Sequence, residues 1–110
     1  MKNPTRITWV DPTQYEDGTP FTAPDFVAYE LGRSSSPTVD PTEVLLVLPV
    51  ALGVGQSPIP DAVRATRGLQ YIFLRTRDVD DEVSVWSSPG AEVQFTRRPL
   101  APTSVDSSIG

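Results

Sequence analysis

The chain of 110 residues contains no cysteine, no histidine and only one lysine, Lys2. Without cysteine there is no disulfide framework, no thiolate nucleophile and no sulfur ligand for a metal. Without histidine, the commonest general base and the commonest metal ligand are missing as well. The serines therefore have no evident base to activate them, and the composition predicts a protein that is not an enzyme and has no cofactor.

Long apolar runs and an excess of positive charge are also missing. The first ten residues lack the apolar run of about 7–15 residues that a secretory signal would contain. The most apolar stretch, 44–54, is too short to span a bilayer and is interrupted by Pro49 and Gly53. The net charge of -5 at pH 7 does not attract a polyanion. We therefore expect neither a membrane nor a nucleic acid as a partner.

Twelve prolines are scattered along the chain, so a long helix is difficult to place. Between turn-forming residues lie short stretches in which polar and apolar residues alternate, as in half-buried strands. The expected strands are RITWV (6–10), FVAYELG (26–32), EVLLVLPVAL (43–52), AVRAT (62–66), LQYIFLRTR (69–77), VSVWSS (83–88) and AEVQFT (91–96). A helix is the alternative at 43–52, although Pro49 favours a strand. This pattern predicts an all-β fold, an antiparallel two-sheet sandwich.

The alternation also predicts which side chains face the core. Ile7 and Trp9 share one face of the first strand, and Val27, Tyr29 and Leu31 share one face of the second.

In the strand 69–77, strict alternation places Tyr71 and Phe73 inward, with Arg75 in the same row, and places Ile72 and Leu74 outward. Two exposed apolar side chains would indicate a surface covered by a partner. The alternative is a β-bulge after Phe73, which would return Leu74 to the core and Arg75 to water.

Several stretches together resemble the fibronectin type III family. Trp9 in ITWVDP matches the core tryptophan of that family, and Tyr29 in EDGTPFTAPDFVAYEL matches the usual tyrosine of its third strand. GLQYIFLRTRD resembles the penultimate strand, and VSVWSSPGAEVQFT resembles the last one. The resemblance implies that Trp9, Tyr29, Tyr71 and Phe73 define the fold, and that the hydroxyl of Tyr71 bonds back to the backbone as a tyrosine corner.

The resemblance does not extend to the first strand. Family domains open with a strand before the tryptophan strand, but too few residues precede it here. A sandwich at 1–96 would then have an open edge that invites another chain. The region 97–110, an extended C-terminal arm, resembles the missing strand. We expect the segment with Thr103, Val105 and Ile109 to enter an exposed edge by strand addition. The edge of a neighbour is the favoured acceptor, and the edge of the same molecule is the alternative.

The charged residues suggest further contacts. Eight arginines favour protein interfaces, unless they reflect host bias. Asp78, Asp80, Asp81 and Glu82 form an acidic cluster whose spacing lacks the D-x-D-x-D-G pattern of a calcium loop. A solvated hairpin tip, or a partner for Arg97 and Arg98 of a neighbour, is the favoured interpretation, and no metal is expected.

The aromatic residues allow a different function. Tyr15, Phe21 and Trp86 lie on the expected long loop and last strand, where they would stack on sugar rings in a carbohydrate-binding sandwich. A role of Trp86 in packing over the sheet is the alternative.

Together these features predict a structural or assembly protein. Sandwich modules of this family are added to bacteriophage capsids, tails and fibres, so the resemblance implies a capsid decoration, collar or tail accessory protein located in the virion. Its partners would be capsid or tail subunits and copies of itself. The predicted interface residues are Ile72, Leu74, Arg97, Arg98, Thr103, Val105 and Ile109. The alternatives are a carbohydrate- or host-surface-binding module outside the cell and a protein-binding adaptor in the bacterial cytoplasm.

Overall fold

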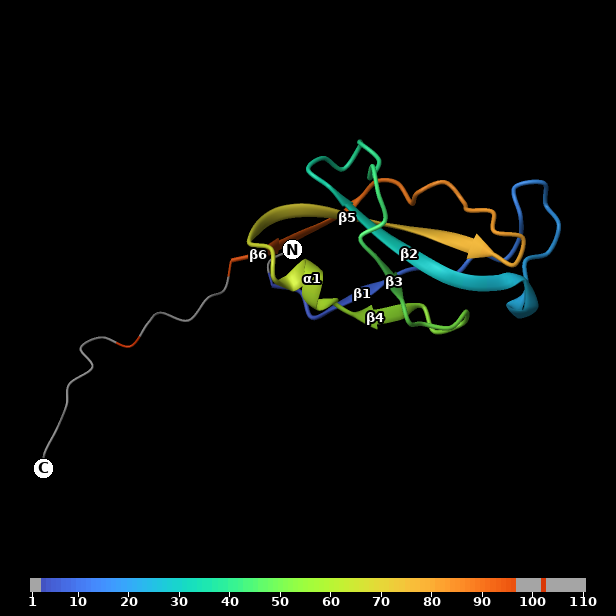
Figure 1. Ribbon diagram of the computed structural model, residues 1–110, viewed down its shortest axis with the longest axis horizontal. Coiled ribbons are helices and arrows are strands. Elements are labelled where there is room, and N and C mark those ends of the chain that lie inside the picture. The colour runs from blue at the N-terminus through green and yellow to red at the C-terminus, as the bar shows by residue number, and fades with distance from the viewer. Residues whose placement is uncertain (1–2, 97–101, 103–110) are drawn as a thin grey trace, which may run out of the picture.

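The computed structural model describes residues 3–96 and 102, which form a mainly β structure with two antiparallel sheets (Figure 1). The smaller sheet pairs β1 (Arg6–Thr8) with β4 (Gln56–Pro58). The larger sheet has the order β3-β2-β5-β6, formed by β2 (Phe26–Ser34), β3 (Leu46–Leu48), β5 (Gly68–Asp78) and β6 (Ala91–Phe95). A 3₁₀ turn, η1 (Ala23–Asp25), and a helical turn, α1 (Asp61–Arg64), complete the elements. The prediction of an all-β fold with antiparallel sheets is confirmed, and the arrangement is consistent with a sandwich.

One hydrophobic core joins the two sheets. Its buried members are Tyr29, Leu31, Leu48, Ile59, Val63, Ile72, Val93 and Phe95. The smaller sheet adds Ile7 and, just beyond β1, Trp9, which are partly buried against this core, whereas Arg6 and Thr8 are exposed. The alternation in RITWV therefore predicted the inward face of β1 correctly.

The prediction of a strand at 62–66 is wrong, because α1 (Asp61–Arg64) occupies this position. Pro60 precedes the turn and Asp61 lies in its first turn, both of which favour the start of a helix. The N–H of Ala65 donates to the carbonyl of Asp61 over 2.8 Å. Val63, which is fully buried, is the only side chain of α1 in the core. A single helical turn is too short to show a period of 3.6 residues.

The faces of β5 are opposite to those predicted. Ile72 is 3% exposed and lies in the core, and Leu74 packs against the same core opposite the fully buried Leu31. Phe73 is also buried, but it pairs with Gly32 on the other face of the sheet. The inward placement of Tyr71 and Phe73 is therefore wrong. Both faces of this strand carry apolar residues, so alternation does not identify the face toward the core.

No bulge follows Phe73 in β5, so the mechanism of this alternative is wrong, although Leu74 does pack against the core as it expected. The pairing of β5 with β2 is continuous from Ala28 to Ser34, and its irregularity lies between Phe26 and Ala28. That irregularity explains a further difference. Val27 was expected on the same side of β2 as Tyr29, but it is 52% exposed. It lies at the register shift, where the regular alternation of side chains between the two faces is interrupted.

The predicted strand at 83–88 is replaced by an irregular segment that pairs with β5 through two serines. The N–H groups of Ser84 and Ser87 donate to the carbonyls of Thr76 and Leu74, and the two hydroxyls accept from the N–H groups of the same two residues. Ser87 lies three positions after Ser84, whereas their partners Leu74 and Thr76 lie only two positions apart. The segment therefore contains one extra residue relative to β5, as in a bulge. The final strand, β6, begins at Ala91, after the predicted kink.

Candidate functional site

The outer edge of β1 has no partner strand within residues 3–96 and 102. The N–H of Trp9 donates to Gly55, and the N–H of Ile59 donates to the carbonyl of Thr5. In an antiparallel ladder, bonded and non-bonded pairs alternate. The backbone N–H and C=O groups of Arg6 and Thr8 therefore point away from β4, toward this open edge.

The other edge of the small sheet is protected. On β4 the outward-pointing residues are Gln56 and Pro58, and proline has no N–H to offer to an added strand. Pro60 follows directly after the strand. β1 contains no proline, so its outward donors remain available. The structure therefore presents one protected and one open edge.

A groove of about 580 Å³ lies at the end of β1, between the loop 10–21 and the segment 79–87. Inner-face residues of the larger sheet, including Tyr29, Leu74 and Thr76, contribute to its lining. Val10 and Val85, which also line it, are 95% and 75% exposed. This combination of an apolar lining and a size of several hundred Å³ is typical of a binding site.

Carboxylates dominate the charged part of this lining. Its acidic members are Glu16, Asp17, Asp78 and Glu82, against one basic residue, Arg75. The Asp17 carboxylate accepts from the N–H and hydroxyl of Thr19, and these bonds lower its pKa. Burial first, and then the nearby carboxylates, raise the pKa of Tyr15 in the same wall. The groove therefore favours a partner that is apolar and positively charged.

Asp11 ties the groove end of β1 to the core. Its Oδ1 accepts from the Trp9 indole Nε1, over 2.9 Å, and from the Tyr29 hydroxyl, and its Oδ2 accepts from the N–H of Gly53 over 3.0 Å. The rings of Trp9 and Tyr29 meet edge to face at 5.2 Å between centroids. Burial, and then the bond to Asp11, raise the pKa of Tyr29. Sequence reasoning identified Trp9 and Tyr29 but missed Asp11, which joins them.

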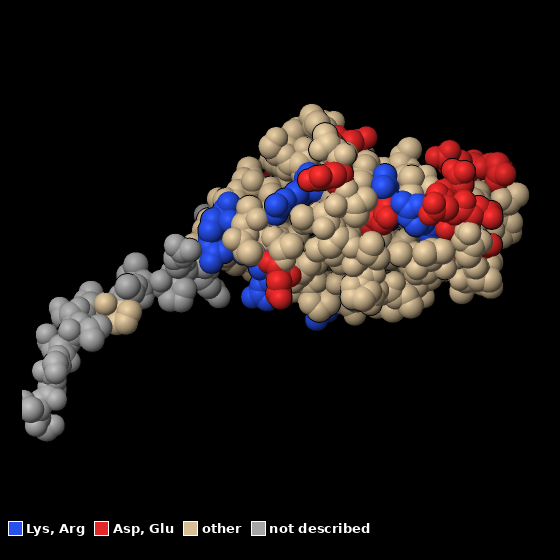
Figure 2. Space-filling model, viewed as in Figure 1, with Lys and Arg blue, Asp and Glu red and all other residues tan. Residues whose placement is uncertain are grey.

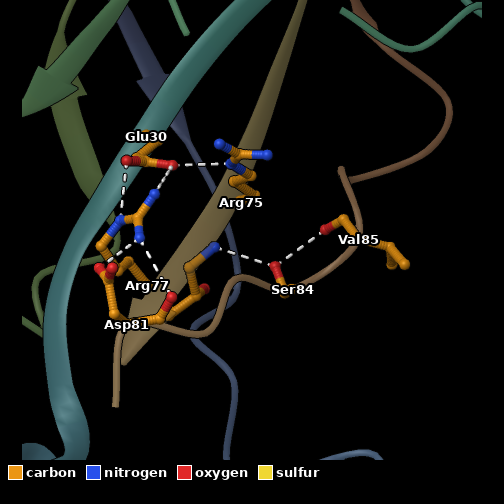
Figure 3. Close-up of polar contacts among 7 residues, drawn as sticks. Glu30, Arg75, Arg77, Asp81, Ser84 and Val85 are labelled. Carbon is orange, nitrogen blue, oxygen red and sulfur yellow. Dashed lines mark hydrogen bonds and ion pairs between the residues drawn. The ribbon is translucent and has the colours of Figure 1, made fainter. Parts of the chain in front are cut away.

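A second charged cluster covers the outer face of the larger sheet (Figure 3). Arg75 Nε lies 2.7 Å from Glu30 Oε1, and Arg77 Nε lies 3.0 Å from Glu30 Oε2. Burial alone would raise the pKa of Glu30, but hydrogen bonds from Arg77 and Arg75 outweigh it, so the pKa is lowered. The Arg75 guanidinium also lies 4.5 Å from the centre of the Trp86 ring. These groups bind one another, so the cluster is structural.

The predicted sugar-stacking residues are not gathered on one face. Tyr15 and Phe21 meet at 5.2 Å in the groove wall, where Phe21 is only 8% exposed. Trp86 lies on the outer face of the larger sheet, beside Gly32 and over Arg75.

Gln70, not Tyr71, makes the contact expected of a tyrosine corner. The side chain of Gln70 is buried, and its Nε2 donates to the carbonyls of Val63 and Thr66 just before β5. Tyr71 lies on the opposite face, paired with Glu92. Gln70 lies two positions before Ile72, so the two side chains share the inward face of β5. A polar residue on that apolar face was the signal that the sequence analysis overlooked.

The acidic cluster forms a hairpin turn. Asp78 Oδ1 accepts from the N–H groups of Asp80 and Glu82, and Asp81 pairs with Arg77. Across residues 3–96 and 102, no group of three or more His, Cys, Asp or Glu side chains is arranged to hold a metal ion. Within the same residues, no helix has the length and apolar character needed to cross a membrane.

Charge is distributed unevenly along the molecule (Figure 2). At the end where β6 finishes, a hollow is lined by Phe95, by two arginines, Arg64 and Arg67, and by one carboxylate, Asp61. Acidic side chains gather at the opposite end of the same view. The chain thus has a basic end beside the start of 97–110 and an acidic end at the groove.

Of the predicted interface residues, two are described. Ile72 is buried in the core and cannot contact a partner, which corrects that prediction. Leu74 is partly buried and contributes to the groove lining. The remaining five lie outside the described residues: Arg97, Arg98, Thr103, Val105 and Ile109.

Comparison of the chain with protein-family models, with curated proteins and with solved structures finds no match.

Proposed function

We propose that this protein is a structural assembly protein that joins other protein subunits by strand addition at the open edge of β1. The observation that carries the proposal is the outward direction of the backbone groups of Arg6 and Thr8, on an edge without proline. Added strands gain affinity from such main-chain groups and specificity from alternate side chains. The donor is the arm at 97–110 of a neighbouring subunit.

The strand order supports a fibronectin-like sandwich without its first strand. In immunoglobulin-type sandwiches the strands A, B, E and D form one sheet and C, F and G form the other. β1 and β4 correspond to B and E, while β2, β5 and β6 correspond to C, F and G. An added strand beside β1 would take the place of A.

The energetics favour a setting with many copies. Each main-chain hydrogen bond contributes about 0.5–1.5 kcal/mol net, while ordering the arm costs roughly 1–2 kcal/mol per residue. A single arm therefore binds weakly, and repeated attachment on a particle supplies avidity. We propose a bacteriophage capsid decoration, collar or tail accessory protein in the virion as this setting, by analogy with the family that the sequence resembles. A carbohydrate-binding role has less support, because Phe21 is buried and Trp86 stacks on Arg75.

Light scattering tests the proposal. The full chain is compared at several concentrations with a chain ending at Thr96, and far-UV circular dichroism verifies that the shorter chain is folded. We expect the full chain to self-associate and the shorter chain to be a monomer. A folded shorter chain that associates as strongly as the full chain contradicts the proposal.

A matched pair of variants tests the edge itself. Thr8→Pro removes an outward N–H, whereas Thr8→Ala keeps it. We expect association to be lost in Thr8→Pro and kept in Thr8→Ala, with both variants folded. Equal association of the two variants shows that β1 is not the acceptor edge.

A further inference from the structure

We propose that copies associate head to tail, with Arg97 and Arg98 of one copy in the acidic groove of the next and the rest of the arm antiparallel to β1. This inference rests on the proposed function. It adds the identity of the partner, the direction of the arm relative to β1 and the site that receives the two arginines. The partner is a second copy of this chain.

The distribution of charge favours the groove of another copy, rather than a site on the same molecule, as the acceptor of the arm. Arg97 and Arg98 follow Thr96, the residue after β6, and the last residue of β6, Phe95, lines a hollow together with two arginines, Arg64 and Arg67, and one carboxylate, Asp61. Their own end of the molecule is thus basic. The groove at the other end carries Glu16, Asp17 and Glu82, together with Asp78. Opposite charges therefore meet only when one copy's basic end faces the groove of another.

The directions of β1 and β6 also favour pairing of the arm with β1 of another copy. β6 runs toward Gly68, and the N–H of Asn3 donates to Gln94 of β6, so β6 ends near the beginning of β1. An arm that turned back onto its own β1 would run parallel to it, away from this end. An arm that begins at a neighbour's groove runs antiparallel to β1, which is the more stable pairing.

The arm can also present apolar side chains to β1. Val105 lies two positions after Thr103, and Ile109 lies four positions after Val105, so an extended arm presents all three on one face. Val10 and Val85 at the groove are 95% and 75% exposed, and the beginning of the arm, next to Arg97 and Arg98, would cover them. Residues 99–102, which separate the two arginines from Thr103, span at most about 14 Å when extended.

Donor and acceptor surfaces differ and lie at opposite ends, so the contact is heterologous. Repetition of such a contact gives a ring or an open chain instead of a closed twofold dimer. The full chain should therefore grow beyond a dimer as its concentration rises.

The test uses charge reversal in the full chain. The groove variant is Glu16→Lys/Glu82→Lys, and the arm variant is Arg97→Glu/Arg98→Glu. The matched control, Glu43→Lys/Glu92→Lys, makes the same change in net charge at exposed residues away from the groove lining. Association is measured by light scattering and sedimentation velocity at low salt. Far-UV circular dichroism verifies folding.

We expect each variant alone to associate about tenfold more weakly than the unaltered chain. Mixing the two should restore association, because the acidic arm fits the basic groove and the basic arm fits the acidic groove. The control should associate more strongly than the groove variant. Full association of both single variants, or a mass that stops at a dimer, overturns the head-to-tail arrangement.

A further arm variant separates this inference from the proposed function. Val105→Asp/Ile109→Asp should prevent association. If it does so while the charge variants associate fully, arm donation holds and the acidic groove is not the receiving site. If it associates normally, arm donation itself fails. A full chain that is monomeric at every concentration overturns self-association and leaves a different subunit as the acceptor.

Discussion

Gln70 donates from its side-chain Nε2 to the main-chain carbonyl of Val63 over 2.9 Å, and this bond fastens α1 to the beginning of β5. Both residues are buried, at 4% and 0% exposed. The contact is local in sequence, yet it holds α1, the only α-helical turn among residues 3–96 and 102, against the core.

Replacing Gln70 by alanine should lower the free energy of unfolding by about 1–3 kcal/mol, because the Val63 carbonyl loses a donor in a buried position. Urea denaturation measures the change. Leu69→Ala, at a half-exposed neighbour on the other face, is the matched control and should change stability less. Equal effects of the two substitutions contradict this role of the amide.

Replacing Asp11 by alanine should destabilise the protein by about 2–4 kcal/mol, because the donors on Trp9, Tyr29 and Gly53 all lose their acceptor. The change should also shift tryptophan fluorescence, since the indole N–H of Trp9 bonds to this carboxylate. Asp40→Ala, at an exposed loop position, is the control. An Asp11 variant as stable as the control would show that these bonds contribute nothing.

Stability should fall in acid partly because of Glu30. The pKa of Glu30 in the folded protein lies below the ordinary value of 4.5, so its stabilising effect is present above that value and is lost as the pH falls through the lower folded pKa. Glu30→Gln cannot titrate and should show a flatter dependence of unfolding free energy on pH. Urea denaturation of both proteins between about pH 6 and pH 2.5 measures this difference. Parallel curves contradict it.

Gly90 should not tolerate a side chain. A Cβ at this position would lie 2.5 Å from the ring of Phe73, so Gly90→Ala should destabilise the protein by about 1–3 kcal/mol. A smaller residue at position 73 should relieve the clash. The double variant Phe73→Leu/Gly90→Ala should thus be more stable than the sum of its single changes implies. Additive effects would mean that the two residues are not in contact.

The sequence was sufficient to predict an all-β fold with antiparallel sheets and the inward face of β1, because strong alternation and turn residues are local signals. It was not sufficient for β5, where apolar residues occupy both faces. Ile72 enters the core, while Phe73 is buried on the outer face, where it lies close to Gly90. The burial of Phe73 on the outer face depends on a segment that is distant in sequence, so the local pattern around β5 could not predict it.

The candidate site was predictable only in part. Within the residues that the structure describes, β1 has one neighbouring strand, β4, and the addition of another strand at its other edge stays a prediction. The groove was not predicted. It forms because the loop 10–21 and the segment 79–87 meet at one end of the sheets, and neither segment has a periodic pattern. The Asp11 and Glu30 clusters were missed because each joins residues from three separate segments.

Amide hydrogen exchange at Arg6 and Thr8 tests the central claim most directly, because their N–H groups point toward the open edge of β1. The full chain and the chain ending at Thr96 are compared at a concentration where the full chain associates. Strand addition predicts slow exchange of both amides in the full chain and fast exchange in the shorter chain. Fast exchange of both amides in the associated full chain would show that no strand is added to β1.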